Sequence, residues 1–346
     1  LVLVHEFGHF IVAKRAGVRV DEFAIGFPPR LVSFKRGETT YSLNLIPLGG
    51  YVRMPGENGE TTDEQGNADP RTFAAQTAGR RAAILVAGVT MNFIFAWLLY
   101  TGFYTVTQQA PNPNIPIISV IEKGSPAAAA GLQPNDRIIA INGQAVHGSE
   151  DVSIFIHNAV ASDHTSSATV PLTLTISRDG QQRDVQVQAR KHPPTGQGAV
   201  GIGIGVLFTH IAPWQAPAVG IWQIGYDFQV EGQGIHDILT GLIKPSDAVA
   251  GPVGIVQAAG DASSQGIGAL IFFTAFLSWN LAVVNLLPIP GLDGGRLLIL
   301  GVEVLRRGKR LAPEREALIN LAGMVFLLSL IAVITFNDIS RIVSGH

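Results

Sequence analysis

The chain has 346 residues, of which 47% are hydrophobic and 14% charged, and its mean hydropathy is +0.30. Typical soluble domains carry about 25% charged residues, so this composition indicates a membrane protein with a soluble insert, in a chain long enough for two domain-sized units. A net charge of −2 gives no basic surplus for nucleic acid, and the absence of cysteine excludes disulfides and thiolate metal sites, which leaves histidine and carboxylate as metal ligands.

Four apolar stretches are predicted to be transmembrane segments, since about 20 apolar residues are needed to cross a bilayer. They are residues 1–16, 84–106, 269–287 and 317–336, and the last three contain no charged residue. The first stretch is short and already apolar at residue 1, which predicts that more of this segment precedes the sequence. A buried core helix is the alternative for each stretch, above all for the first.

Basic residues flank these stretches and predict their orientation, because cytoplasmic loops carry an excess of Lys and Arg. The loops at 17–83 and 289–316 are therefore predicted to be cytoplasmic, which leaves residues 107–268 outside. The basic residues used here are Lys14, Arg15, Arg80, Arg81, Arg296, Arg306, Arg307, Lys309, Arg310 and Arg315.

The first cytoplasmic loop contains LVSFKRGETTYSLNLIPLGGYVRM, which predicts two strands around the turn Arg36-Gly37-Glu38. An apolar bend at 48–50 and a short strand at 51–54 follow. A hairpin with an apolar tip can enter the bilayer only if its backbone groups are paired. A polar linker rich in Gly, Asp and Glu is expected at 56–70.

The outer segment is predicted to hold a compact β-rich unit over residues 115–190. Its first part, IISVIEKGSPAAAAGLQPNDRIIAINGQAV, predicts a strand, a short helix and a second strand that ends at the turn Asn142-Gly143. Asp136 is interpreted as a structural turn residue. The later elements are a helix at 151–161 and strands at 170–177 and 183–189, joined by the hairpin turn Arg178-Asp179-Gly180.

Pro193, Pro194 and the Gly-rich run 196–205 are predicted to mark the end of this unit. A linker follows, in which residues 216–244 are expected to form an amphipathic helix along the outer surface.

The first apolar stretch contains HEFGH, in which His5 and His9 are four residues apart. Positions i and i+4 share one face of a helix, so both imidazoles can bind one metal while Glu6 takes a proton from water. Placing such polar residues in an apolar segment costs several kcal/mol of free energy unless they face a lined cavity and have partners there. Helix-capping or snorkelling side chains are the alternative.

A third ligand is expected from NLLPIPGLDGGR, residues 285–296. Its two prolines must break the helix there, which leaves backbone groups to line a polar pocket. Asp293 then opens a new helix at 294–305. The alternative is an N-cap aspartate, but with HEFGH present a metal ligand is the preferred interpretation.

These motifs, together with GVTMN at residues 88–92, resemble the site-2 protease family of intramembrane zinc metalloproteases. The arrangement is similar to its RseP-like branch, and GSPAAAAGLQPNDRIIAING resembles the PDZ modules of that branch. One PDZ-like unit is found here, where the best-known member has two. The second-span element also lacks the proline that follows its glycine elsewhere in the family.

The resemblance implies one Zn²⁺ per chain, bound by His5, His9 and Asp293, with Glu6 as general base. It also implies a membrane-associated β element that pairs with an extended substrate by strand addition. The implied substrate-binding residues are Asn285, Pro288, Pro290, Gly49, Gly50, Tyr51, Val52, Arg53, Met54 and Asn92.

The expected fold is a multi-span α-helical membrane protein with four transmembrane segments, an inserted β-rich PDZ-like domain and a membrane-associated β-hairpin. The expected parts are an N-terminal membrane part (1–106), the PDZ-like domain (107–195), a linker (196–268) and a C-terminal membrane part (269–346).

The expected activity is hydrolysis of peptide bonds within or near the transmembrane helix of single-span membrane proteins, in the bacterial inner membrane, with the active site towards the cytoplasm. Anti-sigma factors or signal-peptide remnants would suit the resemblance as substrates. A membrane-anchored peptidase of the soluble type and a catalytically silent scaffold that binds through its PDZ-like unit are the alternatives. The other histidines are interpreted as surface or internally satisfied residues: His147, His157, His164, His192, His210, His236 and His346.

Overall fold

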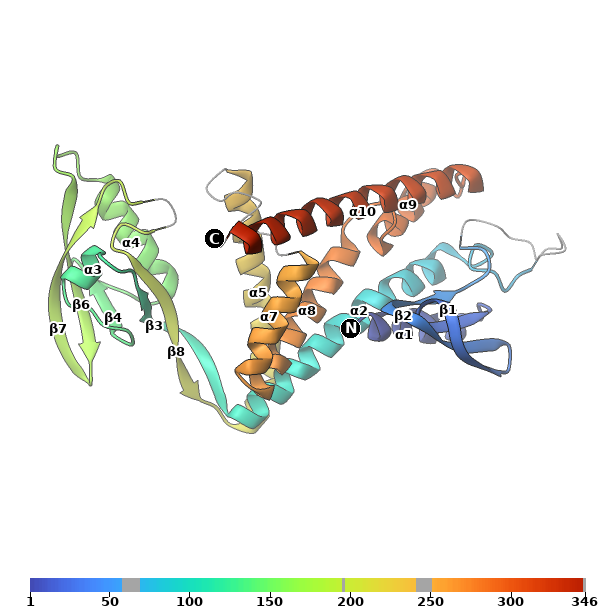
Figure 1. The fold of residues 1–346 in the computed structure, drawn as a ribbon, viewed down its shortest axis with the longest axis horizontal. Coiled ribbons are helices and arrows are strands. Elements are labelled where there is room, and N and C mark those ends of the chain that lie inside the picture. The colour runs from blue at the N-terminus through green and yellow to red at the C-terminus, as the bar shows by residue number, and fades with distance from the viewer. Residues whose placement is uncertain (58–68, 195–196, 241–250, 345–346) are drawn as a thin grey trace. The chain divides into compact units, whose positions relative to one another are not determined.

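The computed structural model describes residues 1–57, 69–194, 197–240 and 251–344. The chain forms two compact units, one made of Leu1–Val106 with Trp214–His346 and the other of Thr107–Pro213 (Figure 1). Most of the polar linker expected at 56–70 lies outside the described residues.

The first unit is mainly helical. Within the described residues, three of its helices are long and apolar enough to cross a membrane: Ala78–Thr107, Ile267–Leu286 and Glu314–Ser340. They coincide with the last three predicted segments. The helices of this unit are α1 (Val2–Arg15), α2 (Ala78–Thr107), α5 (Ala216–Leu239), α7 (Pro252–Ser264), α8 (Ile267–Leu286), α9 (Asp293–Leu305) and α10 (Pro313–Ser344).

The predicted first segment corresponds to α1, which has 14 residues. At 1.5 Å per residue such a helix is about 21 Å long, shorter than the roughly 30 Å hydrocarbon core of a bilayer. Helix α1 is therefore not among the three helices that meet the length requirement.

A two-stranded β element, β1 (Glu22–Arg36) and β2 (Thr39–Arg53), follows α1. The predicted turn is present, with Gly37 at φ +64°. Residues 22–25 of β1 pair with residues 40–43 of β2 and, on the other side, with residues 50–53, because β2 bends back. Residues 50–53 thus have one edge with no strand partner among the described residues. The two strands also expose the apolar side chains of Leu31, Val32, Phe34 and Leu45.

Helix α5 lies at the position of the predicted amphipathic helix, whose last residues, 241–244, are outside the described residues. Its polar side chains bond to the spanning helices: Tyr100 of α2 donates to Asp227 at 2.7 Å, and Trp279 of α8 donates to Glu231 at 3.0 Å. The structure therefore places this helix against α2 and α8, which corrects the prediction of a helix along the outer surface.

The second unit is an antiparallel sheet with strand order β7-β6-β4-β3-β8, and β5 pairs with β4. Its elements are β3 (Gln109–Ile121), α3 (Pro126–Ala129), β4 (Arg137–Ile141), β5 (Gln144–Ala145), α4 (Ser149–Ala161), β6 (Thr169–Arg178), β7 (Gln181–Arg190) and β8 (Ile202–His210). Helix α4 and the sheet enclose a buried core between them, which includes Ile118, Ile138, Val152, Leu172, Leu174 and Ile176.

Two turns of this unit were readable from sequence. Asn142 and Gly143 have φ of +50° and +78°, and Asp179 and Gly180 have +53° and +78°. Positive φ at both central residues is the requirement of a type I′ hairpin turn, which Asn-Gly and Asp-Gly meet at little steric cost.

The predicted boundary of this unit at residue 195 is too early. Strand β8 lies beyond it and pairs with β3 from Ile202 to His210. Gly203 and Gly205 allow this pairing, since a Cβ on either would lie 3.0–3.2 Å from side-chain atoms of β3. The Gly-rich run that predicts a loop is thus partly a strand packed closely on its neighbour.

Candidate metal centre

The two histidines of HEFGH lie on one face of α1 and are 6% and 7% exposed. Their Nε2 atoms are 3.1 Å apart. Asp293 Oδ2 lies 3.0 Å from His5 Nε2 and 3.2 Å from His9 Nε2. These three residues form the metal-ligand cluster found among the described residues, so the structure brings together the ligands predicted from two motifs almost 300 residues apart in the sequence.

The position of Asp293 follows from the helix break before it. Helix α8 ends at Leu286, and α9 begins at Asp293 with Leu292 as its N-cap residue. Asp293 is thus the first residue within the helix, and its carboxylate faces the histidines. The N-cap alternative is therefore not realised.

Glycines let the backbone approach closely around this break. A Cβ on Gly294 would overlap the carbonyl oxygens of Leu286 and Leu287, and a Cβ on Gly295 would overlap that of Ile289. The two glycines after the aspartate are therefore needed to fold the loop against the start of α9. The sequence motif was noted, but this packing role was not predicted.

The donor atoms suit a divalent cation. His9 Nδ1–H donates to the carbonyl oxygen of Ile84 at 2.8 Å, which leaves Nε2 with a lone pair. Asp293 Oδ2 is buried and makes no hydrogen bond with any described residue. Tetrahedral zinc with bonds of about 2.0–2.1 Å separates its ligands by roughly 3.3 Å, close to the observed donor separations.

Asn92 of α2 lies behind His5 and is completely buried. Its amide nitrogen is 3.4 Å from His5 Nδ1, while its Oδ1 has no hydrogen-bond partner among the described residues. Exchanging the amide oxygen and nitrogen gives that oxygen a donor, the Nδ1–H of His5, and directs Nε2 to the metal. The structure therefore places Asn92 as a positioning residue for His5, and the predicted substrate contact is not assigned to it.

Gly88 faces both histidines from α2. A Cβ at this position would overlap His9 Nε2 and lie 2.7 Å from His5 Cε1. Only glycine lets α2 pass this close to the two imidazoles.

A cleft of about 350 Å³ opens beside the three ligands. Glu6 of α1 lies on its wall, Tyr51, Val52 and Met54 approach from β2 and the following residue, and Asn285 approaches from α8. Four of the predicted substrate-binding residues thus line the cleft together with the predicted general base.

The other predicted substrate-binding residues lie near the cleft but do not line it. Gly49, at φ +117°, and Gly50 precede Tyr51 on β2. Arg53 pairs with Glu22 of β1 at 3.2 Å. Pro288 and Pro290 lie in the loop between α8 and α9, and the Pro290 carbonyl packs so closely on α10 that a Cβ on Gly323 would overlap it.

Glu22 is the buried charged anchor of this β element. Burial of its carboxyl raises its pKa, but hydrogen bonds from Ser42 and Arg30 outweigh that effect and hold the pKa of Glu22 below its ordinary value. The carboxylate is therefore ionised at neutral pH and fixes β1 beside the strand that borders the cleft.

Two charged residues of the cleft were not predicted from the sequence. Glu57 and Arg296 line the cleft and form an ion pair of 3.2 Å. They are 239 positions apart and belong to no local pattern, so no signal in a single sequence identifies their pairing.

Comparison with known proteins matches residues 1–330 to the profile of peptidase family M50. A putative zinc metalloprotease of Clostridium perfringens is 34% identical over 339 residues, which cover 98% of this chain and 95% of the relative. A putative zinc metalloprotease of Agrobacterium fabrum is 31% identical, with coverage of 99% and 93%. The regulator of sigma-W protease RasP of Bacillus subtilis is 30% identical, with coverage of 99% and 96%.

Proposed function

Because this chain belongs to peptidase family M50, the site-2 protease family, and is an intramembrane zinc metalloprotease, we propose that His5, His9 and Asp293 hold its zinc ion. The observation that carries this proposal is the convergence of two Nε2 atoms and one carboxylate oxygen within 3.2 Å of one another. The separations of these three donor atoms are close to those of ligands around a tetrahedral zinc ion.

Bound zinc supplies a Lewis acid that polarises a peptide carbonyl and makes water acidic enough to attack at neutral pH. Glu6 is the general base: it accepts the proton of the attacking water and returns it to the departing amine. Its place on the cleft wall, one residue from His5, supports this role.

The substrate must be extended at the bond that is cut, since the peptide bonds of a helix are shielded by its own turns. The unpaired edge of residues 50–53 supports a role in pairing with that extended segment by strand addition. Asn285 faces the same cleft from α8 and is placed to hold the segment through its side-chain amide. Membrane proteins with one transmembrane helix are therefore the proposed substrates.

The proposed topology has α1 as part of a fourth membrane segment, the cleft towards the cytoplasmic side of the bacterial inner membrane, and the second unit outside. The proposed role of the second unit, a PDZ-like domain, is to limit access or bind a trimmed substrate end. Its edge strand β8, with α4 beside it in the same unit, supports peptide binding by strand addition. The name of the Bacillus subtilis relative supports an anti-sigma factor as substrate, and signal-peptide remnants are the second proposed class.

Cleavage of a single-span reporter tests this function. We expect the wild-type chain to cut the reporter in proteoliposomes and Glu6→Gln to reduce cleavage by at least about 10²-fold, as loss of a general base does, with zinc content unchanged. Equal cleavage by the two proteins would refute the role of Glu6. Loss of zinc in Glu6→Gln would show that the residue acts on the ligands and not on the proton.

A further inference from the structure

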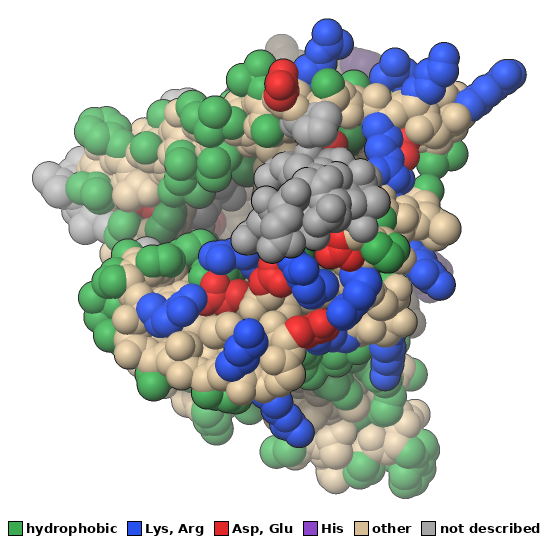
Figure 2. Space-filling view, turned by 90° about the vertical axis from the view of Figure 1, so that its right-hand side faces the viewer, with side chains coloured by type: hydrophobic (Ala, Val, Ile, Leu, Met, Phe, Trp, Pro, Cys, Tyr) green, Lys and Arg blue, Asp and Glu red, His purple; other side chains and the backbone are tan. Residues whose placement is uncertain are grey.

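A second pocket lies in the first unit, apart from the metal ligands. Many of its lining residues come from the start of α2 and from α9 with the loop that follows it, and both helices are labelled in Figure 1. Figure 2 shows Lys and Arg side chains gathered on this side of the molecule, with Asp and Glu among them. The pocket is lined by five basic residues and three acidic ones. These are Arg81, Arg296, Arg306, Lys309 and Arg310, with Glu57, Glu303 and Glu316.

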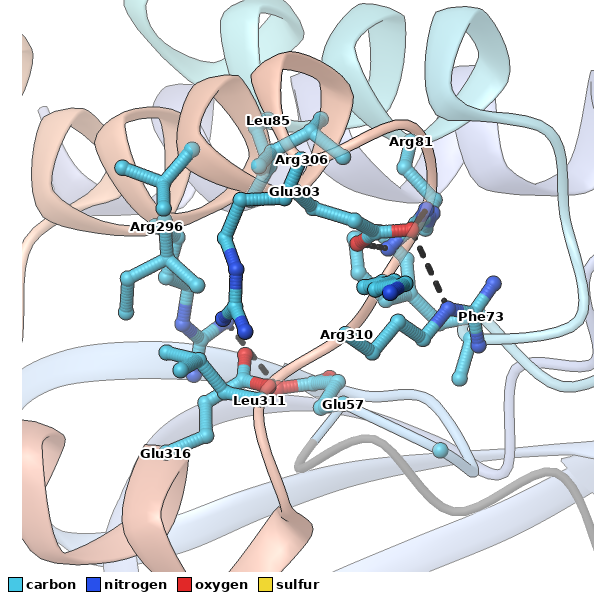
Figure 3. Close-up of a pocket in the computed structure, with 16 residues that line it drawn as sticks. Glu57, Phe73, Arg81, Leu85, Arg296, Glu303, Arg306, Arg310, Leu311 and Glu316 are labelled. Atoms are coloured by element: carbon cyan, nitrogen blue, oxygen red, sulfur yellow. Dashed lines mark hydrogen bonds and ion pairs between the residues drawn. The ribbon is translucent and has the colours of Figure 1, made fainter.

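Most of these charges neutralise one another. Arg81 donates two hydrogen bonds to Glu303, at 2.8 and 2.6 Å, and Arg310 donates to the same carboxylate at 3.1 Å (Figure 3). The ion pair of Arg296 with Glu57 closes the side of the pocket towards the metal cleft. Among the described residues, these pairs fix the frame of the pocket and involve three of its five basic residues and two of its three acidic ones.

Two cations have no such partner. Arg306 and Lys309 make no side-chain hydrogen bond or ion pair with the described residues, although both line the pocket. Arg81 is 8% exposed, and its buried Nε–H likewise has no hydrogen-bond acceptor among those residues. A buried donor without an acceptor costs about 1–3 kcal/mol, so the pocket suits a ligand that brings acceptor oxygens.

The position of the pocket, at the ends of apolar helices, indicates the class of ligand. Its residues stand where the apolar helices α2 and α10 begin, and the ends of membrane helices lie at the level of the lipid headgroups. The enclosed space is about 30 Å³, enough for about two water-sized groups. A whole soluble metabolite would not be enclosed there, whereas part of a headgroup would.

We propose that this pocket binds the headgroup of an anionic phospholipid of the phosphatidylglycerol type. The phosphodiester would accept hydrogen bonds from Arg306 and Lys309, the two unpaired cations. The glycerol hydroxyls of the headgroup would donate to Glu316, the lining carboxylate that has no ion pair among the described residues. Phosphate and hydroxyl groups in one ligand thus match both kinds of free group in the pocket.

The proposed lipid would lie against the helix that supplies a metal ligand. Helix α9 begins with Asp293 and ends beside Arg306, while Leu85, Glu57 and Arg296 line both the pocket and the metal cleft. The lipid site does not rest on the proposed catalytic roles, but it shares a wall with the site where they are assigned.

The test uses the full chain in phosphatidylcholine nanodiscs with about 20 mol% dioleoyl phosphatidylglycerol. Lipid retained after detergent extraction is counted by native mass spectrometry for wild type, Arg306→Gln/Lys309→Gln and the matched control Arg307→Gln/Arg315→Gln. The control removes the same charge from the loop after α9 and from the first turn of α10, outside the pocket lining. Because each cation contributes about fivefold to the binding of anionic lipid, we expect the pocket variant to bind about 30-fold more weakly and the control to keep its lipid.

Three results would overturn the proposal. Equal loss in the two double variants would show only diffuse attraction by a basic loop. Failure of wild type to retain phosphatidylglycerol over phosphatidylcholine would show that the pocket selects no anionic lipid. Displacement of the lipid by millimolar inorganic phosphate would show a site for free phosphate. Zinc content, measured on each variant, controls for the fold.

Discussion

Buried polar groups are paired in the second, β-rich unit but not around the metal ligands. In the second unit, Asp136 is 1% exposed and accepts hydrogen bonds from Arg178 at 2.7 and 2.6 Å and from the Gln133 N–H at 2.8 Å. In the helical unit, the buried oxygens Asp293 Oδ2 and Asn92 Oδ1 have no hydrogen-bond partner among the described residues. Buried polar atoms are nearly always paired, so these two oxygens beside the histidines support a bound metal ion and a residue that orients one of its ligands.

The two regions also differ in what fills them. The second unit is packed with branched side chains around Leu172, Leu174 and Ile176, whereas the histidines of the metal centre are approached by the backbone of Gly88. The second unit thus follows the usual rules of core packing and polar pairing, and the metal centre departs from them, as is expected of a functional site. The following changes test this contrast, from the largest expected effect to the smallest.

Gly88→Ala should have the largest effect. Its methyl group would overlap His9 Nε2 and press on His5, so either α2 or both imidazoles must move. A displacement of about 1 Å costs on the order of 10²-fold in rate, and we expect at least that loss in reporter cleavage. Gly102→Ala is the matched control on the same helix, since no described atom outside the helix lies within 4 Å of its added methyl. Equal activity of the two variants would contradict the close packing at Gly88.

Leu174→Ala should destabilise the second unit and leave the metal centre intact. The side chain is fully buried, and its truncation should destabilise the unit by about 2–5 kcal/mol. Hydrogen exchange of β6 in the full chain measures this loss, and zinc content should remain at the wild-type value. Leu207→Ala, at a position that is 41% exposed, provides a control with a small effect. Loss of zinc in Leu174→Ala would show that the two regions are not independent.

Asn92→Ala should weaken metal binding without unfolding the helical unit. Residues that orient a metal ligand typically contribute 10–100-fold to affinity, so we expect zinc to be lost to a chelator at a correspondingly lower chelator concentration. Thr90→Ala, an exposed change on the same helix, should leave the zinc affinity unchanged. An unaltered zinc affinity in Asn92→Ala would contradict the role of Asn92 as a positioning residue.

Asp136 should give the smallest effect, seen as a dependence on pH. Burial raises its pKa, but the Arg178 ion pair and the Gln133 N–H outweigh this and hold the pKa of Asp136 below its ordinary value. A lowered pKa in the folded state adds stability that is fully present above about pH 4 and lost as the pH falls through the folded value. We expect hydrogen-exchange protection of β6, corrected for intrinsic rates, to fall on acidification. This fall should be weaker in Asp136→Asn. An identical pH profile in the variant would contradict a contribution of the Asp136 carboxylate to the pH dependence.

What could be predicted from sequence follows the same division. The i, i+4 spacing of His5 and His9 and the proline break before Asp293 carry their geometry locally, so the three ligands were predictable. The Asn-Gly and Asp-Gly turns of the second unit were predictable for the same reason. Contacts between distant segments were not: the pairing of Glu57 with Arg296 and the packing of Gly88 on the histidines have no local pattern. Strand β8 was hidden because glycines that fit it against β3 are also typical of loops.

Zinc stoichiometry in the purified full-length chain tests the central claim most directly. Metal analysis should give one zinc per wild-type chain and a loss to near zero in Asp293→Ala. The matched variant Asp136→Ala should keep its zinc, because the hydrogen bonds of that carboxylate lie within the second unit. One zinc retained with unchanged affinity in Asp293→Ala would contradict the assignment of His5, His9 and Asp293 as the metal site.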